Sequence, residues 1–189
     1  MKSVARSGKS ADARAIRQLL RACETRFTDW EVPTPFTITR LVEHLSDRRN
    51  RLIHLIPTEL GADRPSGIWL ALPALDVVIY ESRTSRTHQE HIIAHELAHM
   101  LCEHTQEAPL DRDTAGRLFP GLDPRLVQQM MGRTKYPDGD ELEAEVMASV
   151  ILCRMNSRPP SGTSVPDSDS RGILHRLERS FSIGGGSAV

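Results

Sequence analysis

The sequence predicts an α+β fold in one domain: N-terminal helices, a small, mostly antiparallel β-sheet, and two further helices packed beneath the sheet. Three observations support this prediction. Apolar residues recur with helical spacing near the N-terminus, three short β-branched runs follow, and two long segments of helical character come later. At 189 residues the chain is long enough for one domain with a hydrophobic core and too short for two complete ones.

The N-terminal half is predicted to form two helices and then three strands. Helices are expected over residues 10–27 and 36–45, because apolar side chains there are spaced three and four apart. Strands are expected at residues 52–55, 67–72 and 76–80, which are rich in Ile, Val, Trp and Tyr. Prolines and glycines separate these segments.

The C-terminal half is predicted to be helical with long connections. Helices are expected over residues 87–104 and 140–155. A short helix is expected to start at Asp123, and another to cover residues 173–181.

The composition divides the chain into three parts. Residues 1–9 are expected to be a flexible N-terminus and residues 10–156 a single domain. The segment 157–189 is rich in Pro, Ser and Gly, so we expect a largely disordered tail.

Charge and hydropathy exclude some classes of partner. Lys and Arg number 24 against 25 Asp and Glu, so we expect no direct nucleic-acid binding and no attraction to anionic membranes. No apolar run resembles a secretory signal or a membrane span, which predicts a cytoplasmic protein. The three cysteines, Cys23, Cys102 and Cys153, form no CxxC pair and are expected to be buried thiols in a reducing compartment. The sequence is silent on oligomeric state.

Five of the eight histidines lie between residues 88 and 104. They include the HExxH sequence from His95 to His99. On a helix, residues four apart lie on one face with their Cβ atoms about 6 Å apart, so two imidazoles can converge on one ion. Glu96 lies one step round the helix, where its carboxylate can reach a water molecule rather than the metal. This arrangement is typical of metal-assisted hydrolysis.

The other histidines of this segment compete for the same role. His91 also lies four residues from His95, but His91 and His99 are about 12 Å apart along a helix axis, so one ion cannot serve all three. Only the pair 95/99 has a Glu directly after its first His. We therefore expect His91 and Cys102 to be partly buried core residues. His88 is expected near the helix start and in solvent, and His104 at the helix end.

A catalytic zinc needs a third protein ligand and leaves a position for water. A histidine six residues after His99 would supply it in one class of zinc site, but that residue is Thr105. Glutamates of a later helix are the alternative. Glu141 and Glu145 share one helix face, so either could be the ligand while the other supports an imidazole N–H, and Glu143 points roughly to the other side. Three solvated glutamates at a helix start are a further alternative.

Two motifs together resemble the ImmA/IrrE family of metallopeptidases. They are AHELAHMLCEH (94–104) and ELEAEVMASVIL (141–152), and the likeness covers residues 66–154. The resemblance implies a minimal zincin-like, gluzincin-type domain with Zn²⁺ held by His95, His99 and Glu141. It makes Glu96 the catalytic carboxylate and gives Glu145, which replaces a common Asn, a supporting role.

Two aspects of the resemblance concern the substrate: the positions where this chain departs from the family's sequence pattern, and the biology of the family. Met147 replaces a usual aromatic residue, and residues 152–155 replace the closing LLMP, so the substrate-side wall should differ. The resemblance implies proteolysis of a protein substrate, often a DNA-binding repressor of the helix-turn-helix type, in phage, mobile-element, stress or toxin–antitoxin control.

The resulting hypothesis is zinc-dependent peptide hydrolysis with Glu96 as the general base. A donor for the tetrahedral oxyanion is also needed, and Tyr136 ranks before His104 and His54. The rival is a zinc-stapled interaction module or toxin component that controls a regulator by binding without cutting it. In a third alternative the motif is coincidental and no zinc binds.

Overall fold

The computed structural model describes residues 4–60, 65–72, 74–104 and 136–156, with side chains described from Arg14 onward. This part of the chain contains four helices and a three-stranded sheet, which confirms the predicted α+β class. In chain order the elements are α1 (Val4–Asp29), α2 (Ile38–Arg49), β1 (Leu52–Thr58), β2 (Gly67–Ala71), β3 (Leu75–Glu81), α3 (Arg86–Leu101) and α6 (Asp138–Asn156). The predicted helices at Asp123 and 173–181, and the tail 157–189, lie outside the described residues.

The sheet is mixed, so the prediction of a mostly antiparallel sheet was wrong. Its strand order is β1-β3-β2: β3 pairs antiparallel with β2 and parallel with β1. β3 takes the central position and buries four consecutive side chains, Asp76 to Ile79. Because β3 is inserted between β1 and β2, the order of strands along the chain does not give their order in the sheet.

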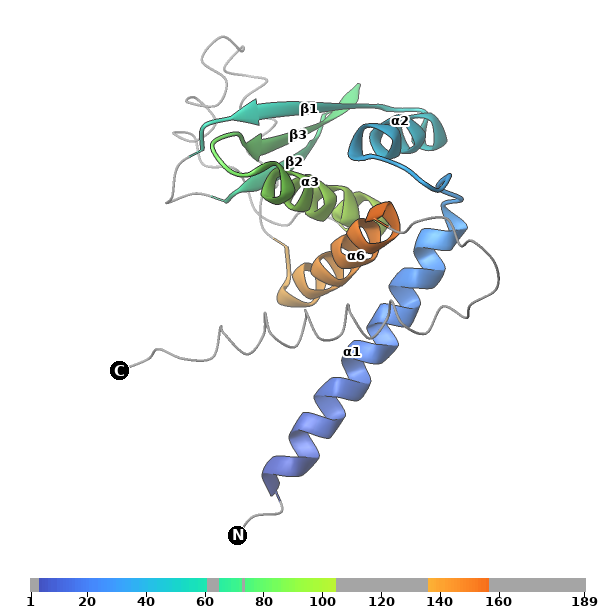
Figure 1. Ribbon diagram of the computed structural model, residues 1–189, viewed down its shortest axis with the longest axis vertical. Helices are drawn as coiled ribbons and strands as arrows, with labels where there is room; N and C mark the ends of the chain where they lie inside the picture. The colour runs from blue at the N-terminus through green and yellow to red at the C-terminus, as the bar shows by residue number, and fades with distance from the viewer. Residues whose placement is uncertain (1–3, 61–64, 73, 105–135, 157–189) are drawn as a thin grey trace.

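The helices lie on one face of the sheet, successively farther from it (Figure 1). α3 packs directly against β2 and β3, α6 packs against α3, and α1 packs against α6. α2 lies against β1 and the end of α3. The hydrophobic core fills the space between these elements, and its largest fully buried side chains include Leu41, Leu45, Leu97, Met100, Leu101, Met147 and Ile151.

Local signals set the ends of α2 and α3. Ser85 begins α3 because its Oγ accepts a hydrogen bond from the backbone N–H of His88 at 3.3 Å. Thr37 caps α2 in the same way, through the backbone N–H of Arg40. α3 ends at Leu101, before the predicted end at His104, because Glu103 adopts a left-handed conformation with φ 57°. At the other end of the chain, α1 begins at Val4 rather than at the predicted residue 10.

A buried carboxylate joins α2 to the sheet. Asp76 is fully buried on β3 and lies 3.1 Å from Arg49 Nη2 and 3.0 Å from Arg51 Nε. The indole N–H of Trp69 also donates to it at 3.2 Å. Removing any one of these partners would leave the buried charge less well paired, which is costly. The hydrogen bond to Asp76 therefore fixes the orientation of Trp69 on β2. Within the part of the chain that the structure describes, no helix has an apolar stretch long enough to cross a bilayer.

Candidate metal centre

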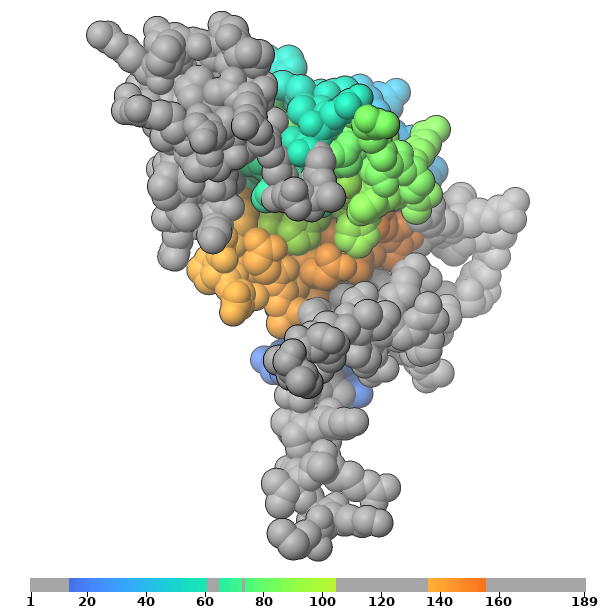
Figure 2. Space-filling model, turned by 90° about the vertical axis from the view of Figure 1, so that its left-hand side faces the viewer, coloured from blue at the N-terminus to red at the C-terminus, as the bar shows by residue number. Residues whose placement is uncertain are grey.

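Complementary faces of α3 and α6 build the candidate site. Side chains with the same i, i+3, i+4, i+7 spacing form a basic stripe on one helix and an acidic stripe on the other: His91, Ala94, His95 and Ala98 on α3, and Glu141, Ala144, Glu145 and Ala148 on α6. All four alanines are completely buried, and their small side chains allow a close approach of the backbones. Figure 2 shows α6 (orange) lying along α3 (green).

The contacts between the stripes follow an antiparallel register. His95 Nε2 lies 3.2 Å from Glu141 Oε2, and His95 Nδ1 lies 3.6 Å from Glu145 Oε2. His91 Nε2 lies 3.3 Å from the same Glu145 oxygen. Glu145 therefore contacts two histidines of α3, and Glu141 is left to face the HExxH pair. The sequence alone had left the choice between these two glutamates open.

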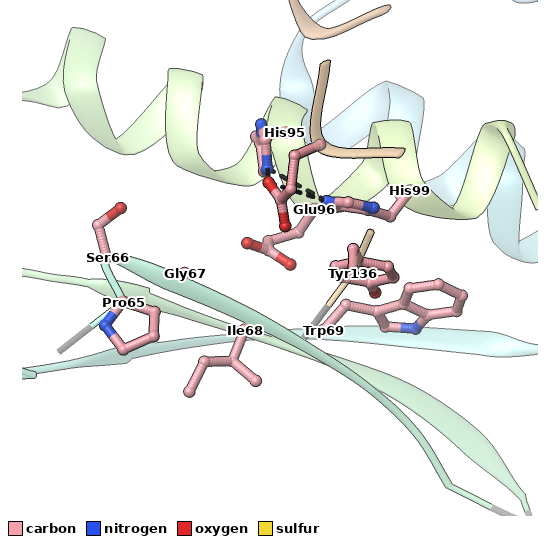
Figure 3. A pocket seen from close by; sticks show the side chains of 10 residues that line it. Pro65, Ser66, Gly67, Ile68, Trp69, His95, Glu96, His99 and Tyr136 are labelled. Carbon is pink, nitrogen blue, oxygen red and sulfur yellow. Dashed lines mark hydrogen bonds and ion pairs between the residues drawn. The ribbon is translucent and has the colours of Figure 1, made fainter. Parts of the chain in front are cut away.

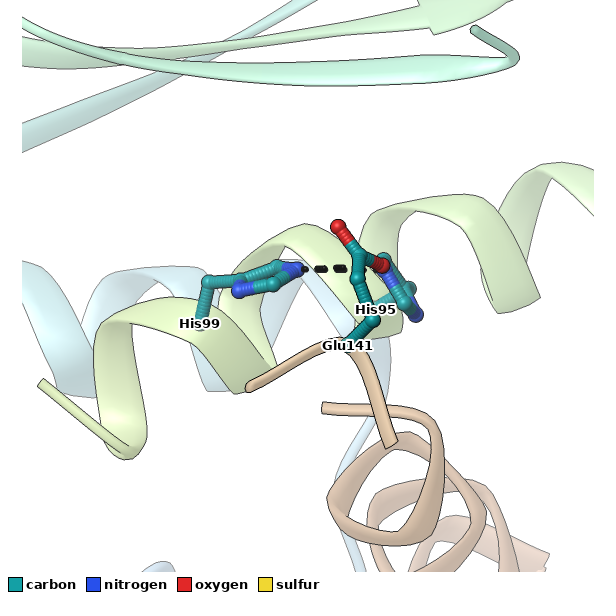
Figure 4. Close-up of side chains that lie close together, drawn as sticks. All are labelled: His95, His99 and Glu141. Carbon is teal, nitrogen blue, oxygen red and sulfur yellow. Dashed lines mark hydrogen bonds and ion pairs between the residues drawn. The ribbon is translucent and has the colours of Figure 1, made fainter. Parts of the chain in front are cut away.

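Three ligand atoms converge on one point (Figure 4). We call His95, His99 and Glu141 the site cluster. The separations are 3.1 Å between His95 Nε2 and His99 Nε2, 3.2 Å between His95 Nε2 and Glu141 Oε2, and 3.9 Å between His99 Nε2 and Glu141 Oε2. Two ligands of a tetrahedral zinc, each about 2.0 to 2.1 Å from the ion, lie about 3.3 Å apart. The site cluster could thus hold a metal ion, and two imidazoles with one carboxylate form a donor set that suits catalytic zinc.

Glu96 lies between α3 and β2, on the sheet side of the site cluster (Figure 3). Its side chain is almost completely buried and accepts a hydrogen bond from the backbone N–H of Trp69. Burial raises the pKa of Glu96 to about 7; the charge of Glu141 adds to this, while His95 and the Trp69 N–H oppose it. A carboxyl group with this pKa can both take up and release a proton near neutral pH.

Gly67 on β2 makes room for this carboxylate. A Cβ atom at residue 67 would lie 2.6 Å from Glu96 Oε1 and 2.6 Å from Ile92 Cγ2. Neither distance is tolerated between non-bonded atoms, so with any other residue at this position the side chains of Glu96 and Ile92, or β2 itself, would have to move. The sequence analysis did not identify Gly67 as a site residue. The signal for it is a single glycine at the start of an apolar strand run.

A cavity of about 330 Å³ opens beside these groups. Its volume lies at the lower end of the range of small-molecule pockets. β2 and the residues before it form one wall, α3 forms another, and Tyr136 and Glu141 complete the lining (Figure 3). The lining residues are Pro65, Ser66, Gly67, Ile68, Trp69, His95, Glu96, His99, Tyr136 and Glu141.

The pKa values of the two histidines of the site cluster are shifted in opposite directions. Burial lowers the pKa of His95, but the hydrogen bonds with Glu141 and Glu145 and the charge of Glu96 outweigh it and raise the pKa to about 10. Burial lowers the pKa of His99 to about 3, and the neighbouring imidazoles of His95 and His104 lower it further. The hydrogen bonds from His91 and His95 lower the pKa of Glu145 to about 2 against the effect of its burial.

Of the three candidate oxyanion donors, the structure brings one to the cavity. Tyr136 lines it and stacks on the imidazole of His99, with ring centroids 3.6 Å apart and an interplanar angle of 15°. His54 lies exposed on β1, at the edge of the sheet opposite to β2, so it does not reach the site. His104 is buried behind His99 and does not line the cavity.

A second group of ligand-type side chains lies deeper between the same helices. Cys102, His104 and Glu143, which we call the inner cluster, also have ligand atoms within 4.8 Å of one another and could hold a metal ion. Glu143 does face away from His95, as predicted, but it is not simply solvated. Its Oε2 lies 3.3 Å from His104 Nε2, and its Oε1 lies 3.4 Å from Nη1 of Arg26 on α1.

Three expectations for the remaining side chains have distinct outcomes. His88 is exposed in the first turn of α3, as predicted, and contacts Thr84 Oγ1. His104 does not end the helix as a solvated cation but is buried just beyond it, because the turn after α3 folds it inward. Cys102 is buried as predicted, and its free thiol forms a hydrogen bond with the thiol of Cys23. That hydrogen bond and burial raise the pKa of the Cys102 thiol above its usual range.

Comparison of the chain with models of known protein families finds no match, and comparison with curated proteins also finds none. Support for a function therefore comes from the site itself.

Proposed function

We propose that the protein is a zinc-dependent metallopeptidase that hydrolyses a peptide bond in a protein substrate. The observation that carries this proposal is the placement of Glu96: a buried carboxylate with a pKa near neutrality lies directly beside three convergent metal-ligand atoms, in a cavity bounded by a strand. The order of the residues, His-Glu-x-x-His followed by a Glu on a second helix, supports a zincin-like domain of the gluzincin type. The resemblance to ImmA/IrrE metallopeptidases supports the same class.

The residues of the chain divide the chemistry as follows. His95, His99 and Glu141 would hold the zinc, which when bound polarises the scissile carbonyl and lowers the pKa of a water molecule. Glu96 accepts a proton from the attacking water and later returns it to the leaving amine. The backbone N–H of Trp69 holds the Glu96 carboxylate at the sheet side of the cavity during both transfers.

Tyr136 is the donor that we assign to the oxyanion. Its ring lines the cavity next to His99, and phenol hydroxyls are among the groups that stabilise developing negative charge. Glu145 has a supporting role: it contacts His91 and His95 and so orients the first ligand of the HExxH pair.

The border of the cavity supports a peptide substrate. Among the described residues β2 pairs with β3 alone, and residues 65–69 line the cavity. An extended peptide could add to this edge as a further strand, which would bring its carbonyl groups past Glu96. The family resemblance supports a DNA-binding regulator of the helix-turn-helix type as the substrate.

Replacement of Glu96 by Gln tests the proposal. The variant keeps the shape of the side chain but cannot accept the proton, so cleavage should fall by about 10²- to 10⁴-fold while zinc content and fold persist. Wild type and variant are incubated with candidate helix-turn-helix regulators, and the products are identified by mass spectrometry. Zinc is measured in the same samples by elemental analysis.

Two other outcomes would identify the rivals. If the Glu96→Gln variant controls a regulator as well as the wild type does, without cleavage, the protein is a zinc-stapled interaction module. If the purified wild type contains and binds no stoichiometric zinc, the HExxH sequence is not a metal site, and hydrogen bonds alone hold the site cluster together.

A further inference from the structure

The turn that follows α3 folds His104 back against His99. The backbone N–H of His104 donates to the carbonyl of His99 at 3.0 Å, and that of Glu103 donates to the carbonyl of Met100 at 3.2 Å. With Glu103 in the left-handed conformation, these two bonds form a Schellman motif. The motif brings the Nδ1 atoms of the two imidazoles to 2.9 Å from each other.

The contact between these rings belongs to a longer chain of contacts. His104 Nε2 lies 3.3 Å from Glu143 Oε2, and Arg26 Nη1 lies 3.4 Å from Glu143 Oε1 and 3.0 Å from the Cys102 carbonyl. His99 and His104 are both buried, so their ring nitrogens must find partners within the protein rather than in solvent. This series of contacts therefore links His99 of the site cluster to the guanidinium of Arg26 on α1.

The position of one hydrogen decides what His99 can bind. Two ring nitrogens at 2.9 Å share a single hydrogen, so one of them donates and the other accepts. The Glu143 carboxylate, which faces the Arg26 guanidinium, is an acceptor, so His104 Nε2 must donate to it. A neutral His104 then has its lone pair on Nδ1, and His99 Nδ1–H donates to it.

We propose that His104 is a positioning residue: anchored by Glu143, it holds His99 in the tautomer whose Nε2 lone pair faces His95 Nε2 and Glu141. This inference rests on the proposed function only in that the Nε2 lone pair serves a metal ion. It assigns to the inner cluster a role in support of the site cluster.

The same hydrogen bears on the use of the inner cluster as a metal site of its own. If His104 Nε2 bound a metal, the hydrogen of a neutral His104 would lie on Nδ1 and would donate to His99 Nδ1. His99 would then carry its hydrogen on Nε2 and lose the lone pair that faces His95. Two neutral imidazoles in this contact cannot ligate metals in both clusters at once, so the two clusters together should hold one zinc ion.

The tautomers can be observed directly by long-range ¹H–¹⁵N NMR spectra of the uniformly labelled protein. Spectra are recorded near neutral pH, after treatment with a chelator and again after addition of zinc. We expect the hydrogen of His99 on Nδ1 and that of His104 on Nε2 in both samples. A hydrogen on Nδ1 of His104 in either sample would overturn the proposal.

Two variants of His104 separate positioning from packing. In His104→Gln the amide oxygen can accept from His99 Nδ1–H while the amide nitrogen donates to Glu143, whereas His104→Leu fills a similar space and can do neither. We expect zinc affinity, measured by competition with a chromophoric chelator, to stay within a few fold of wild type for Gln and to fall about 10- to 100-fold for Leu. Circular dichroism and thermal unfolding report whether both variants fold.

The results also distinguish this inference from the proposed function. Equal affinities of wild type and His104→Leu, or an equal loss in two folded variants, would overturn the positioning role and leave the metal site intact. Absence of zinc binding by the wild type would instead contradict the proposed function. In that case the tautomers in the chelator-treated protein would still test the inference. They would also test it if neither variant folded.

Discussion

The site cluster and the inner cluster lie between the same two helices and contain similar side chains, but their surroundings differ. Glu141 of the site cluster is about half exposed and faces the cavity, and among the described residues its ion-pair partners are the two histidines. Glu143 of the inner cluster is less exposed and already faces both Arg26 and His104. The comparison teaches that residue type alone does not define a ligand. What matters is whether the acceptor atoms already have partners, and whether substrate can reach them.

Paired removal of the two glutamates should give the largest difference between the clusters. Glu141→Ala deletes a proposed ligand, so zinc content after dialysis against a weak chelator should fall from about one per chain to near zero. Glu143→Ala removes the anchor of His104 and the ion pair with Arg26 but no ligand of the site cluster, so the variant should retain zinc with about 10- to 100-fold weaker affinity. Elemental analysis and chelator competition measure the two quantities.

The reverse pattern would show that the clusters have been assigned the wrong way round. If Glu141→Ala kept its zinc and Glu143→Ala lost it, the inner cluster would be the metal site. Because Glu141 is about half exposed, its truncation should leave the thermal unfolding of the zinc-free protein nearly unchanged, which separates loss of a ligand from loss of the fold.

A smaller effect is expected when the metal ligands stay in place and only Glu96 moves. In Gly67→Ala the new methyl group collides with Glu96 Oε1, so the carboxylate must leave its position beside the Trp69 N–H. We expect peptide cleavage to fall by about 10- to 100-fold while zinc content is unchanged. The assay measures cleavage of a regulator whose cleavage is reduced by the Glu96→Gln substitution.

Gly139 offers a matched control for this substitution. A Cβ atom there meets nothing within 4 Å, and the residue lies in the first turn of α6 rather than in the cavity wall. Gly139→Ala should leave cleavage and zinc content unchanged. Full activity in Gly67→Ala would mean that β2 yields to the methyl group and that the close approach of strand and helix is not needed.

The parts of this molecule that follow from local sequence were predictable. The helix that carries His95 and His99 and the one that carries Glu141 and Glu145 follow from spacing along single segments, and the three strands lie within a few residues of their predicted positions. The zinc assignment of Glu141 came from the family resemblance and remains a proposal.

The features that the sequence did not predict depend on contacts between distant segments. The parallel pairing of β1 with β3 is set by which strand occupies the centre of the sheet. The role of Glu143 depends on Arg26, which comes from another helix more than a hundred residues earlier in the chain. The position of His104 depends on a left-handed conformation at Glu103, a residue type that rarely adopts it.

The smallest expected effect concerns that residue. Glu103 has φ 57°, a conformation that is unfavourable for residues with a Cβ atom and open to glycine. Glu103→Gly should therefore stabilise the fold by about 0.5 to 1 kcal/mol. In a chain of this size such a change raises the thermal midpoint by about 1 to 4 °C. Calorimetry measures the shift, and chelator competition should show zinc affinity equal to that of the wild type.

Glu103→Val changes the same residue in the opposite direction. A β-branched side chain disfavours the left-handed conformation, so the turn should open and His104 should lose its contact with His99. The thermal midpoint should fall, and zinc affinity should fall toward that of His104→Leu. If Val weakened the fold but left zinc affinity unchanged, the turn would serve stability alone. The inner cluster would then be packed against the site cluster without supporting it.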